Sequence, residues 1–177
     1  MKQEIFIVIV NVLFVCLGNI CRSPMAAGIL ARNYLEDGVD GVIESCGVMD
    51  WNHGSRADQR AIDVCLENGV DIRAHRARQI EVEDFHRFDL ILVMDAGNEK
   101  AVRKLAPTTS GSKILRVAEL EGDGDECDRS RMNKNRRNEI VAGQPSLDIA
   151  DPYNSDLEAF RKTFKRLEKL LCLPLEF

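Results

Sequence analysis

The chain has 177 residues, 45% hydrophobic and 30% charged, so it can bury the core of one globular domain, which we expect to span residues 1–177. Its 12 glycines and 5 prolines are too few for a fibrous or wholly disordered protein. The net charge of −5 argues against a dedicated nucleic-acid-binding protein, which usually presents a basic face. Any anionic ligand must therefore be attracted by charge close to its site.

Strands and helices alternate along the chain. Residues 8–15 form a Val, Ile and Phe-rich run that is typical of a strand covered on both faces. Ser23 followed by Pro24 predicts an N-cap and a first helical turn, and the apolar spacing continues this helix to about residue 36. Further strands are expected at 42–45, 89–94 and 113–117, and further helices at 56–68, 98–105 and 155–172.

This order predicts a three-layer α/β fold, with a four-stranded central parallel sheet, helices on both faces, and a phosphate-binding loop between the first strand and the first helix. Residues 119–143 interrupt the pattern, because their first half is acidic and their second half basic. A charged run without apolar periodicity predicts a solvated insertion. A docking surface for a charged partner is the alternative.

The cysteines and the apolar amino-terminal stretch indicate the cellular compartment of the protein. No two of the six cysteines are spaced as a CxxC pair, and a chain of this size does not depend on disulfides as small secreted scaffolds do. Residues 5–17 lack the cleavage site of a signal peptide and are too few to span a bilayer, which takes roughly 20 residues. We therefore expect reduced thiols in a cytoplasmic protein that binds neither membrane nor nucleic acid.

A Cys-x5-Arg motif lies where the first strand meets the first helix. Ligands of parallel sheets bind at the carboxyl ends of the strands, and a tight loop there can turn its amides toward an anion, with the helix dipole behind them. Gly18, and Asn19 to a lesser degree, can adopt the left-handed backbone angles that such a loop needs. The predicted phosphate-binding loop consists of Cys16, Leu17, Gly18, Asn19, Ile20, Cys21, Arg22 and Ser23.

Cys16 is the candidate nucleophile. A helix N-terminus and a nearby arginine stabilise a thiolate, although a cysteine that ends a buried strand can also be an inert packing residue. A thiolate that attacks phosphorus needs a carboxylic acid from another loop to protonate the leaving oxygen. Asp151, followed by Pro152 and Tyr153, is the candidate acid, and Asp148 is its rival.

These residues resemble the low-molecular-weight protein tyrosine phosphatase family. The resemblance rests on the strand at 12–15, the loop CLGNICRSP, the Asp-Pro-Tyr at 151–153, and several shorter matches in the family's order: Ser45-Cys46-Gly47, Trp51, His53, Gly54, Asp58, Arg60, His75 to Gln79 and Met94-Asp95. It implies an enzyme that hydrolyses phosphotyrosine in proteins through a cysteinyl-phosphate intermediate and releases inorganic phosphate. It implies no metal and no other cofactor.

The resemblance also implies a role for each site residue. Cys16 would attack phosphorus while Arg22 stabilises the phosphoryl group. Asp151 would first protonate the tyrosyl oxygen and then activate water, and Ser23 would stabilise Cys16 as it leaves. Asn19 would hold the strained loop through contacts with Ser23, Ser45 and His75, and Ile20, Trp51 and Tyr153 would line the substrate cleft.

Two residues of the loop carry further hypotheses. Phosphoarginine-directed relatives have a small polar threonine at the position of Ile20, so the isoleucine favours phosphotyrosine. Cys21 could form a reversible disulfide with Cys16 and protect it from over-oxidation, as an alternative to a packing role. Peroxide inactivation that dithiothreitol cannot reverse would argue against this redox role.

The chain departs from the family pattern at two places, and two alternative functions stay open. Tyr153 is followed by Asn154 rather than by the second tyrosine that the family often has, and the amino-terminal residues 1–7 have no family counterpart. An arsenate reductase of the same fold would need a cysteine pair that this chain lacks between Cys65 and Cys127. A noncatalytic phosphoprotein-binding module would keep the loop but lack a nucleophile or an acid.

Overall fold

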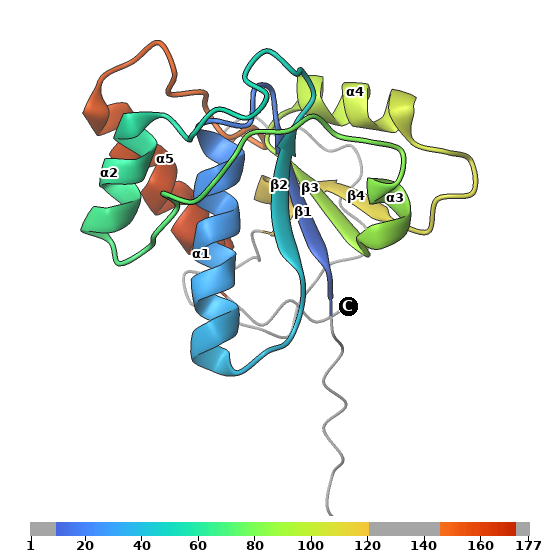
Figure 1. Ribbon diagram of the computed structural model, residues 1–177, viewed down its shortest axis with the longest axis horizontal. Helices are drawn as coiled ribbons and strands as arrows, with labels where there is room; N and C mark the ends of the chain where they lie inside the picture. Colours follow the sequence, from blue (N-terminus) through green and yellow to red (C-terminus); the bar gives the residue numbers. More distant parts are fainter. Residues whose placement is uncertain (1–9, 121–145, 173–177) are drawn as a thin grey trace, which may run out of the picture.

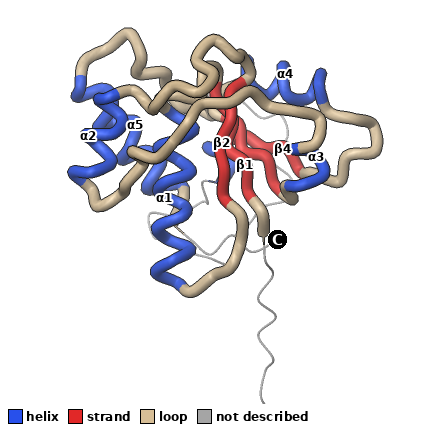
Figure 2. Tube along the Cα trace, viewed as in Figure 1, coloured by secondary structure: helices blue, strands red, loops and turns tan. Residues whose placement is uncertain are grey.

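The computed structural model describes residues 10–120 and 146–172. The four strands are β1 (Val12–Cys16), β2 (Ile43–Gly47), β3 (Leu90–Val93) and β4 (Lys113–Arg116). The helices are α1 (Arg22–Asp37), α2 (Gln59–Glu67), α3 (Asp84–Arg87), α4 (Ala96–Leu105) and α5 (Leu157–Leu170), with a 3-10 helix η1 (Val117–Leu120). Figures 1 and 2 show the strands in the middle of the molecule with helices on both sides.

The sheet is parallel throughout and has the order β2-β1-β3-β4. β1 is central, with Val12 opposite Ile43 on one side and Leu90 on the other. All five residues of β1 are buried, as a strand covered on both faces requires. The predicted fold class, a three-layer α/β fold with a four-stranded parallel sheet, is confirmed.

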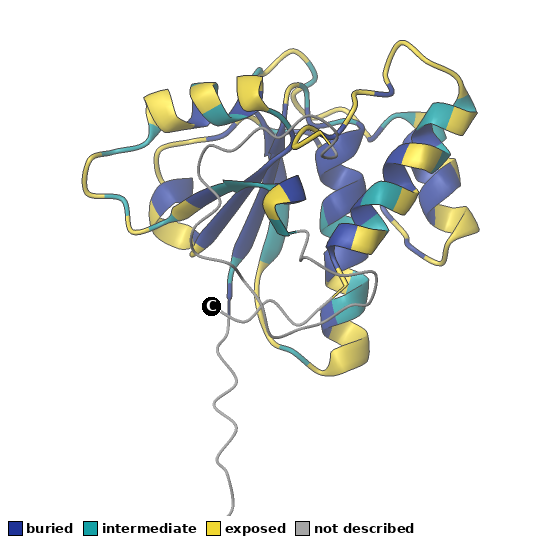
Figure 3. Cartoon of the chain, turned by 180° about the vertical axis from the view of Figure 1, so that it is seen from behind, coloured by how far each residue is buried: buried dark blue, intermediate teal, exposed yellow. Residues whose placement is uncertain are grey.

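Successive residues of β1 point into two separate cores. Val12, Phe14 and Cys16 pack in the core beneath α1, α2 and α5, whereas Leu13 and Val15 pack in the core beneath α3 and α4. This alternation follows from the two-residue period of a strand. Figure 3 shows the buried strands between helices whose outer faces are exposed.

The apolar spacing of the longer helices explains where they lie. In α5, Phe160, Phe164 and Leu167 are fully buried, and the side chain of Asp156 caps the helix by accepting a hydrogen bond from Ala159 N at 3.0 Å. α1 ends at Asp37 and is followed by its C-cap Gly38, whose φ of 65° is the left-handed conformation that glycine adopts most easily. None of the helices in the described ranges is long and apolar enough to cross a bilayer.

Some sequence expectations about the elements are wrong. Ser23 is not the N-cap of α1: the helix begins at Arg22, and the Ser23 hydroxyl faces Cys16 instead. The short helices α3 and η1 were not expected, because four residues carry too little periodicity to be recognised. The amino-terminal extension at 1–7 lies outside the described residues, as does the charged insertion at 119–143 apart from its first two residues, which end η1.

Candidate active site

Cys16 is the last residue of β1, and the loop at 17–21 connects it directly to α1. Its sulfur lies 3.0 Å from Ser23 Oγ and accepts a hydrogen bond from the backbone N–H of Asn19 at 3.3 Å. The residue is 3% exposed, so these contacts form in a largely dehydrated place. The loop thus turns a backbone amide and a hydroxyl toward the cysteine sulfur at the N-terminal end of a helix.

Asn19 holds the loop from inside the protein. It is fully buried, and its φ of 56° is left-handed. Its Nδ2 donates to Ser23 Oγ and to Ser45 Oγ at 2.9 Å each, and its Oδ1 accepts from the backbone N–H of Arg78 at 3.0 Å. Its own carbonyl accepts from His75 Nε2 at 2.8 Å. Ser23 and two distant segments, β2 and the segment that contains His75 and Arg78, therefore fix a backbone conformation that non-glycine residues rarely adopt.

The glycine of the loop has a different purpose from the one expected. Asn19, and not Gly18, has the left-handed backbone. A Cβ at Gly18 would lie 2.6 Å from Asn52 Nδ2, which donates to Gly18 O at 2.9 Å. A side chain at position 18 would therefore displace the Asn52 amide that binds Gly18 O.

Arg22 is buried and joins the loop to two acidic residues. Its Nη1 donates to Asp95 Oδ2 at 2.7 Å and to the carbonyl of Ile149 at 3.0 Å, and its Nη2 donates to Asp151 Oδ2 at 2.7 Å. Asp95 follows β3, at the same edge of the sheet as Cys16, and its Oδ1 also caps α4 through Asn98 N. Asp95 was expected only as part of the family resemblance and without a role; its position just after a buried strand was the available signal.

The two candidate acids lie in different surroundings. Asp151 contacts Arg22 directly, and its Oδ1 accepts from Tyr153 N at 3.1 Å. Asp148 instead accepts from the backbone N–H of Ala96 at 3.0 Å and from Arg116 Nη1 at 3.4 Å. Asp148 is thus engaged at the start of α4, whereas Asp151 is joined to the phosphate-binding loop.

The residues expected to line a cleft differ in exposure. Trp51 and Tyr153 are 68% and 51% exposed, whereas Ile20 is partly buried against the core. The turn that carries Trp51 lies beside the loop, because Met49 N donates to Leu17 O at 2.9 Å. Tyr153 follows Asp151 and binds it through its backbone N–H, so both exposed rings belong to segments that contact the loop or Arg22 and can offer apolar surface to a ligand.

Burial controls the ionisation of two supporting residues. Burial, reinforced by the charge of Asp58, raises the pKa of the Cys21 thiol, so Cys21 is protonated at neutral pH. Burial lowers the pKa of His75, so its ring is neutral and its Nε2–H donates to Asn19 O. The redox role of Cys21 stays a prediction.

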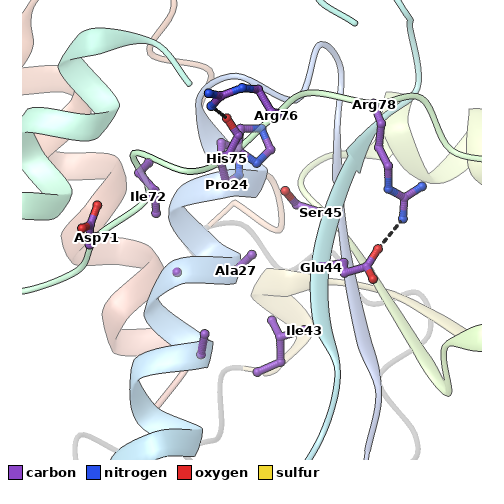
Figure 4. A pocket seen from close by; sticks show the side chains of 12 residues that line it. Pro24, Ala27, Ile43, Glu44, Ser45, Asp71, Ile72, His75, Arg76 and Arg78 are labelled. Atoms are coloured by element: carbon purple, nitrogen blue, oxygen red, sulfur yellow. Dashed lines mark hydrogen bonds and ion pairs between the residues drawn. The ribbon is translucent and has the colours of Figure 1, made fainter. Parts of the chain in front are cut away.

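A pocket of about 410 Å³ lies between α1, β2 and the segment at 71–78 (Figure 4). Its lining includes Ser45 and His75, both of which hold Asn19. Cys16, Arg22 and Asp151 are absent from its lining. This pocket is therefore separate from the reactive groups of the candidate active site, which lie around Cys16.

Known proteins resemble this chain over most of its length. A family model described as low molecular weight phosphotyrosine protein phosphatase matches residues 11–128. The low molecular weight phosphotyrosine protein phosphatase of Sus scrofa is 47% identical over 154 residues, which cover 84% of this chain and 85% of that protein. The low molecular weight protein-tyrosine-phosphatase of Streptomyces coelicolor is 32% identical over 160 residues, which cover 89% and 87%.

Solved structures agree with this result. A low molecular weight protein tyrosine phosphatase from T. tengcongensis has a TM-score of 0.72 at 32% identity, with 92% of this chain and 95% of that chain covered. All three relatives are named as tyrosine phosphatases, which disfavours the arsenate reductase alternative. The chain belongs to the low molecular weight phosphotyrosine protein phosphatase family.

Proposed function

We propose that the chain is a protein tyrosine phosphatase that hydrolyses phosphotyrosine with Cys16 as its nucleophile. The observation that carries this proposal is the convergence of Asn19 N–H and Ser23 Oγ on the sulfur of Cys16, at 3.3 and 3.0 Å. These groups stabilise a thiolate at the end of a strand that faces the N-terminus of α1. The named activity of the relatives supports the same reaction.

In the first step, the sulfur of Cys16 forms a bond to phosphorus as the bond from phosphorus to the tyrosyl oxygen breaks. Asp95 and Ile149 O fix Nη1 of Arg22, which orients the guanidinium so that its other N–H groups can bind phosphoryl oxygens. Asp151 then gives its proton to the departing tyrosyl oxygen. The products of this step are the dephosphorylated tyrosyl residue of the substrate and a cysteinyl phosphate.

In the second step, water attacks phosphorus and the carboxylate of Asp151 takes one of its protons. The bond between sulfur and phosphorus breaks, and inorganic phosphate leaves. The Ser23 hydroxyl, 3.0 Å from the sulfur, stabilises the departing thiolate. Each residue returns to its starting state, so the cycle requires no further reactant.

Asp151 is the better candidate for the acid because it already lies against Arg22, the residue that would bind the phosphoryl group. Asp148 is held by the amide of Ala96 and by Arg116. We propose that Trp51, Tyr153 and Ile20 select an aromatic phosphoester, because two exposed rings and an apolar side chain suit a phenyl group better than a short aliphatic one. The physiological partners would then be proteins that carry phosphotyrosine.

Three variants test this proposal with p-nitrophenyl phosphate and a phosphotyrosine peptide as substrates. Cys16→Ser should abolish turnover, and Asp151→Asn should lower kcat/KM by about 10²–10⁴-fold, the usual contribution of a general acid. Asp148→Asn is the matched control and should change kcat/KM less than about threefold. A larger loss of kcat/KM in Asp148→Asn than in Asp151→Asn would overturn the assignment of Asp151 as the acid. Binding of the peptide without turnover by the wild-type protein would indicate a noncatalytic module.

We also propose a cytoplasmic location. Three of the described cysteines, Cys21, Cys46 and Cys65, are buried reduced thiols with raised pKa values. Reduced thiols persist in the cytoplasm rather than in oxidising compartments. Recovery of the native protein in a secreted or membrane fraction after cell fractionation would contradict this location.

A further inference from the structure

Arg60, in the first turn of α2, binds two carbonyl groups of the segment that follows Asp151. Its Nη2 donates to Tyr153 O at 3.0 Å, and its Nη1 donates to Ser155 O at 2.7 Å. One planar guanidinium donates both hydrogen bonds, and the two carbonyls that accept them are two residues apart. This segment is therefore attached to α2 at both sides of Asn154.

The guanidinium itself is held firmly. Asp58, the N-cap of α2, accepts from Arg60 Nε at 2.9 Å and from Arg60 Nη2 at 2.8 Å, while it also caps Arg60 N at 2.9 Å. The Cζ of Arg60 lies 4.4 Å from the centre of the Phe160 ring of α5, within the range of a cation–π contact. The hydrogen bond from Arg60 lowers the pKa of Asp58, so the pair stays charged at neutral pH.

The same pair connects the two halves of the candidate active site. The backbone N–H of Asp58 donates to the carbonyl of Ile20, in the phosphate-binding loop, at 2.8 Å. At the other end, Tyr153 uses its carbonyl for Arg60 and its N–H for Asp151 Oδ1, at 3.1 Å. A continuous series of hydrogen bonds thus runs from the loop of the nucleophile to the carboxylate of the acid.

We infer that Arg60 is a positioning residue that sets the place of Asp151 relative to the phosphate-binding loop and thereby controls protonation of the leaving group. The inference rests on the proposed function. Proton transfer requires the acid within hydrogen-bond reach of the leaving oxygen, so a small displacement of Asp151 costs rate. Arg60 acts on Asp151 through the backbone of Tyr153 rather than on the phosphoryl group.

The test compares esters that differ in their need for an acid. Phenyl phosphate releases a basic phenolate and needs a proton, whereas 2,4-dinitrophenyl phosphate releases a weakly basic phenolate and does not. For Arg60→Met we expect kcat/KM to fall by about 10–10²-fold with phenyl phosphate and by less than about threefold with the dinitrophenyl ester. Competitive inhibition by inorganic phosphate should stay within about twofold of wild type, because the loop that binds it is unchanged.

Two further variants separate positioning from general structural damage. Arg161→Met removes an ion pair of 2.8 Å with Glu67, which also joins α5 to α2 but does not touch the Asp151 segment. We expect it to behave as wild type with both esters. Arg60→Lys keeps the positive charge, but its single ammonium group cannot bind Asp58 and two carbonyls together. We therefore expect its loss of kcat/KM to depend on the leaving group in the same way but to be smaller than that of Arg60→Met.

The outcomes separate this inference from the proposed function. A wild-type protein that hydrolyses neither ester overturns the proposed function, and the role of Arg60 falls with it. If the wild type is active but Arg60→Met loses the same factor with both esters, or loses nothing, the positioning role alone is overturned. Wild-type behaviour of Arg60→Lys beside a defective Arg60→Met would show that charge suffices, and would also overturn it.

Discussion

At the scale of single residues, Asn19 combines a left-handed backbone with a side chain whose donors and acceptor are all used. Asparagine tolerates this backbone better than most residues, although it still costs energy relative to glycine. The hydrogen bonds to Ser23, Ser45 and Arg78 offset that cost. The residue therefore keeps the loop in shape only as long as its buried partners stay in place.

Two substitutions of Asn19 separate its backbone from its side chain. Asn19→Ala loses the side-chain hydrogen bonds and keeps the backbone strain, whereas Asn19→Gly loses the same bonds but relieves the strain. We expect the Ala variant to lose about 2–4 kcal/mol of unfolding free energy, because buried partners are left unpaired in a strained loop. The Gly variant should be about 1 kcal/mol more stable than the Ala variant. Urea unfolding measures both, and equal values would contradict the argument from strain.

At the scale of elements, the segment at 71–78 couples β2 to the phosphate-binding loop. Arg78 accepts from Gly47 N at 2.8 Å through its carbonyl and donates through its own N–H to Asn19. His75 in the same segment donates to Asn19 O. Although residues 71–78 form no helix or strand, the segment therefore fixes the end of β2 and the centre of the loop.

The neutral His75 makes the stability of this arrangement depend on pH. Its pKa is lower in the folded protein than in the unfolded chain, so the unfolded chain binds more protons as the pH falls. The stability is fully present above the unfolded value of about 6.5 and is lost as the pH falls toward the lower folded value. We expect the urea concentration at the midpoint of unfolding to decrease as the pH is lowered from about 7.5 to about 5.5.

The matched variant is His75→Gln, in which Nε2 of an amide can still donate to Asn19 O but does not titrate in this window. We expect its midpoint to change less than that of wild type over the same pH range. Carboxylates with lowered pKa values, such as Asp58 and Asp71, lose their contribution only at more acidic pH. An identical pH dependence in both proteins would contradict the assignment to His75.

At the scale of the whole molecule, the sheet separates two cores, and each contains a deeply buried thiol. Cys65 packs in the core beneath α1, α2 and α5, and burial raises its pKa to about 12. Cys46 packs in the opposite core, where burial also raises its pKa. Both thiols are inaccessible unless the corresponding core opens.

Alkylation can therefore report on the opening of each core. With iodoacetamide at neutral pH, we expect Cys46 and Cys65 to stay unlabelled in the native protein and to become labelled together as urea unfolds it. The exposed Cys172 is the internal reference and should react without urea. Mass spectrometry of peptides measures all three. Labelling of Cys65 at the rate of Cys172 in native protein would contradict the packing described here.

Local sequence patterns were sufficient to predict the order of strands and helices in the molecule. The continuous apolar run before Cys16 and the helical spacing after it predicted a buried strand, a loop and a helix, because these patterns depend on neighbouring residues. They also placed the Cys-x5-Arg motif at the carboxyl end of a strand. Boundaries shifted by a few residues where side chains had other partners, as when Ser23 turned toward Cys16 instead of capping α1.

The α/β framework and the loop from Cys16 to Arg22 could be predicted from the amino-acid sequence alone, because both depend on contiguous residues. The contact of Arg22 with Asp151 rather than Asp148 became evident from the packing of the folded chain, because Arg22 and Asp151 are 129 positions apart. The packing likewise revealed the pairing of Arg22 with Asp95 and the connection through Arg60. Such contacts depend on how separate elements pack, and no periodicity along the chain encodes which of two nearby carboxylates the packing brings against Arg22.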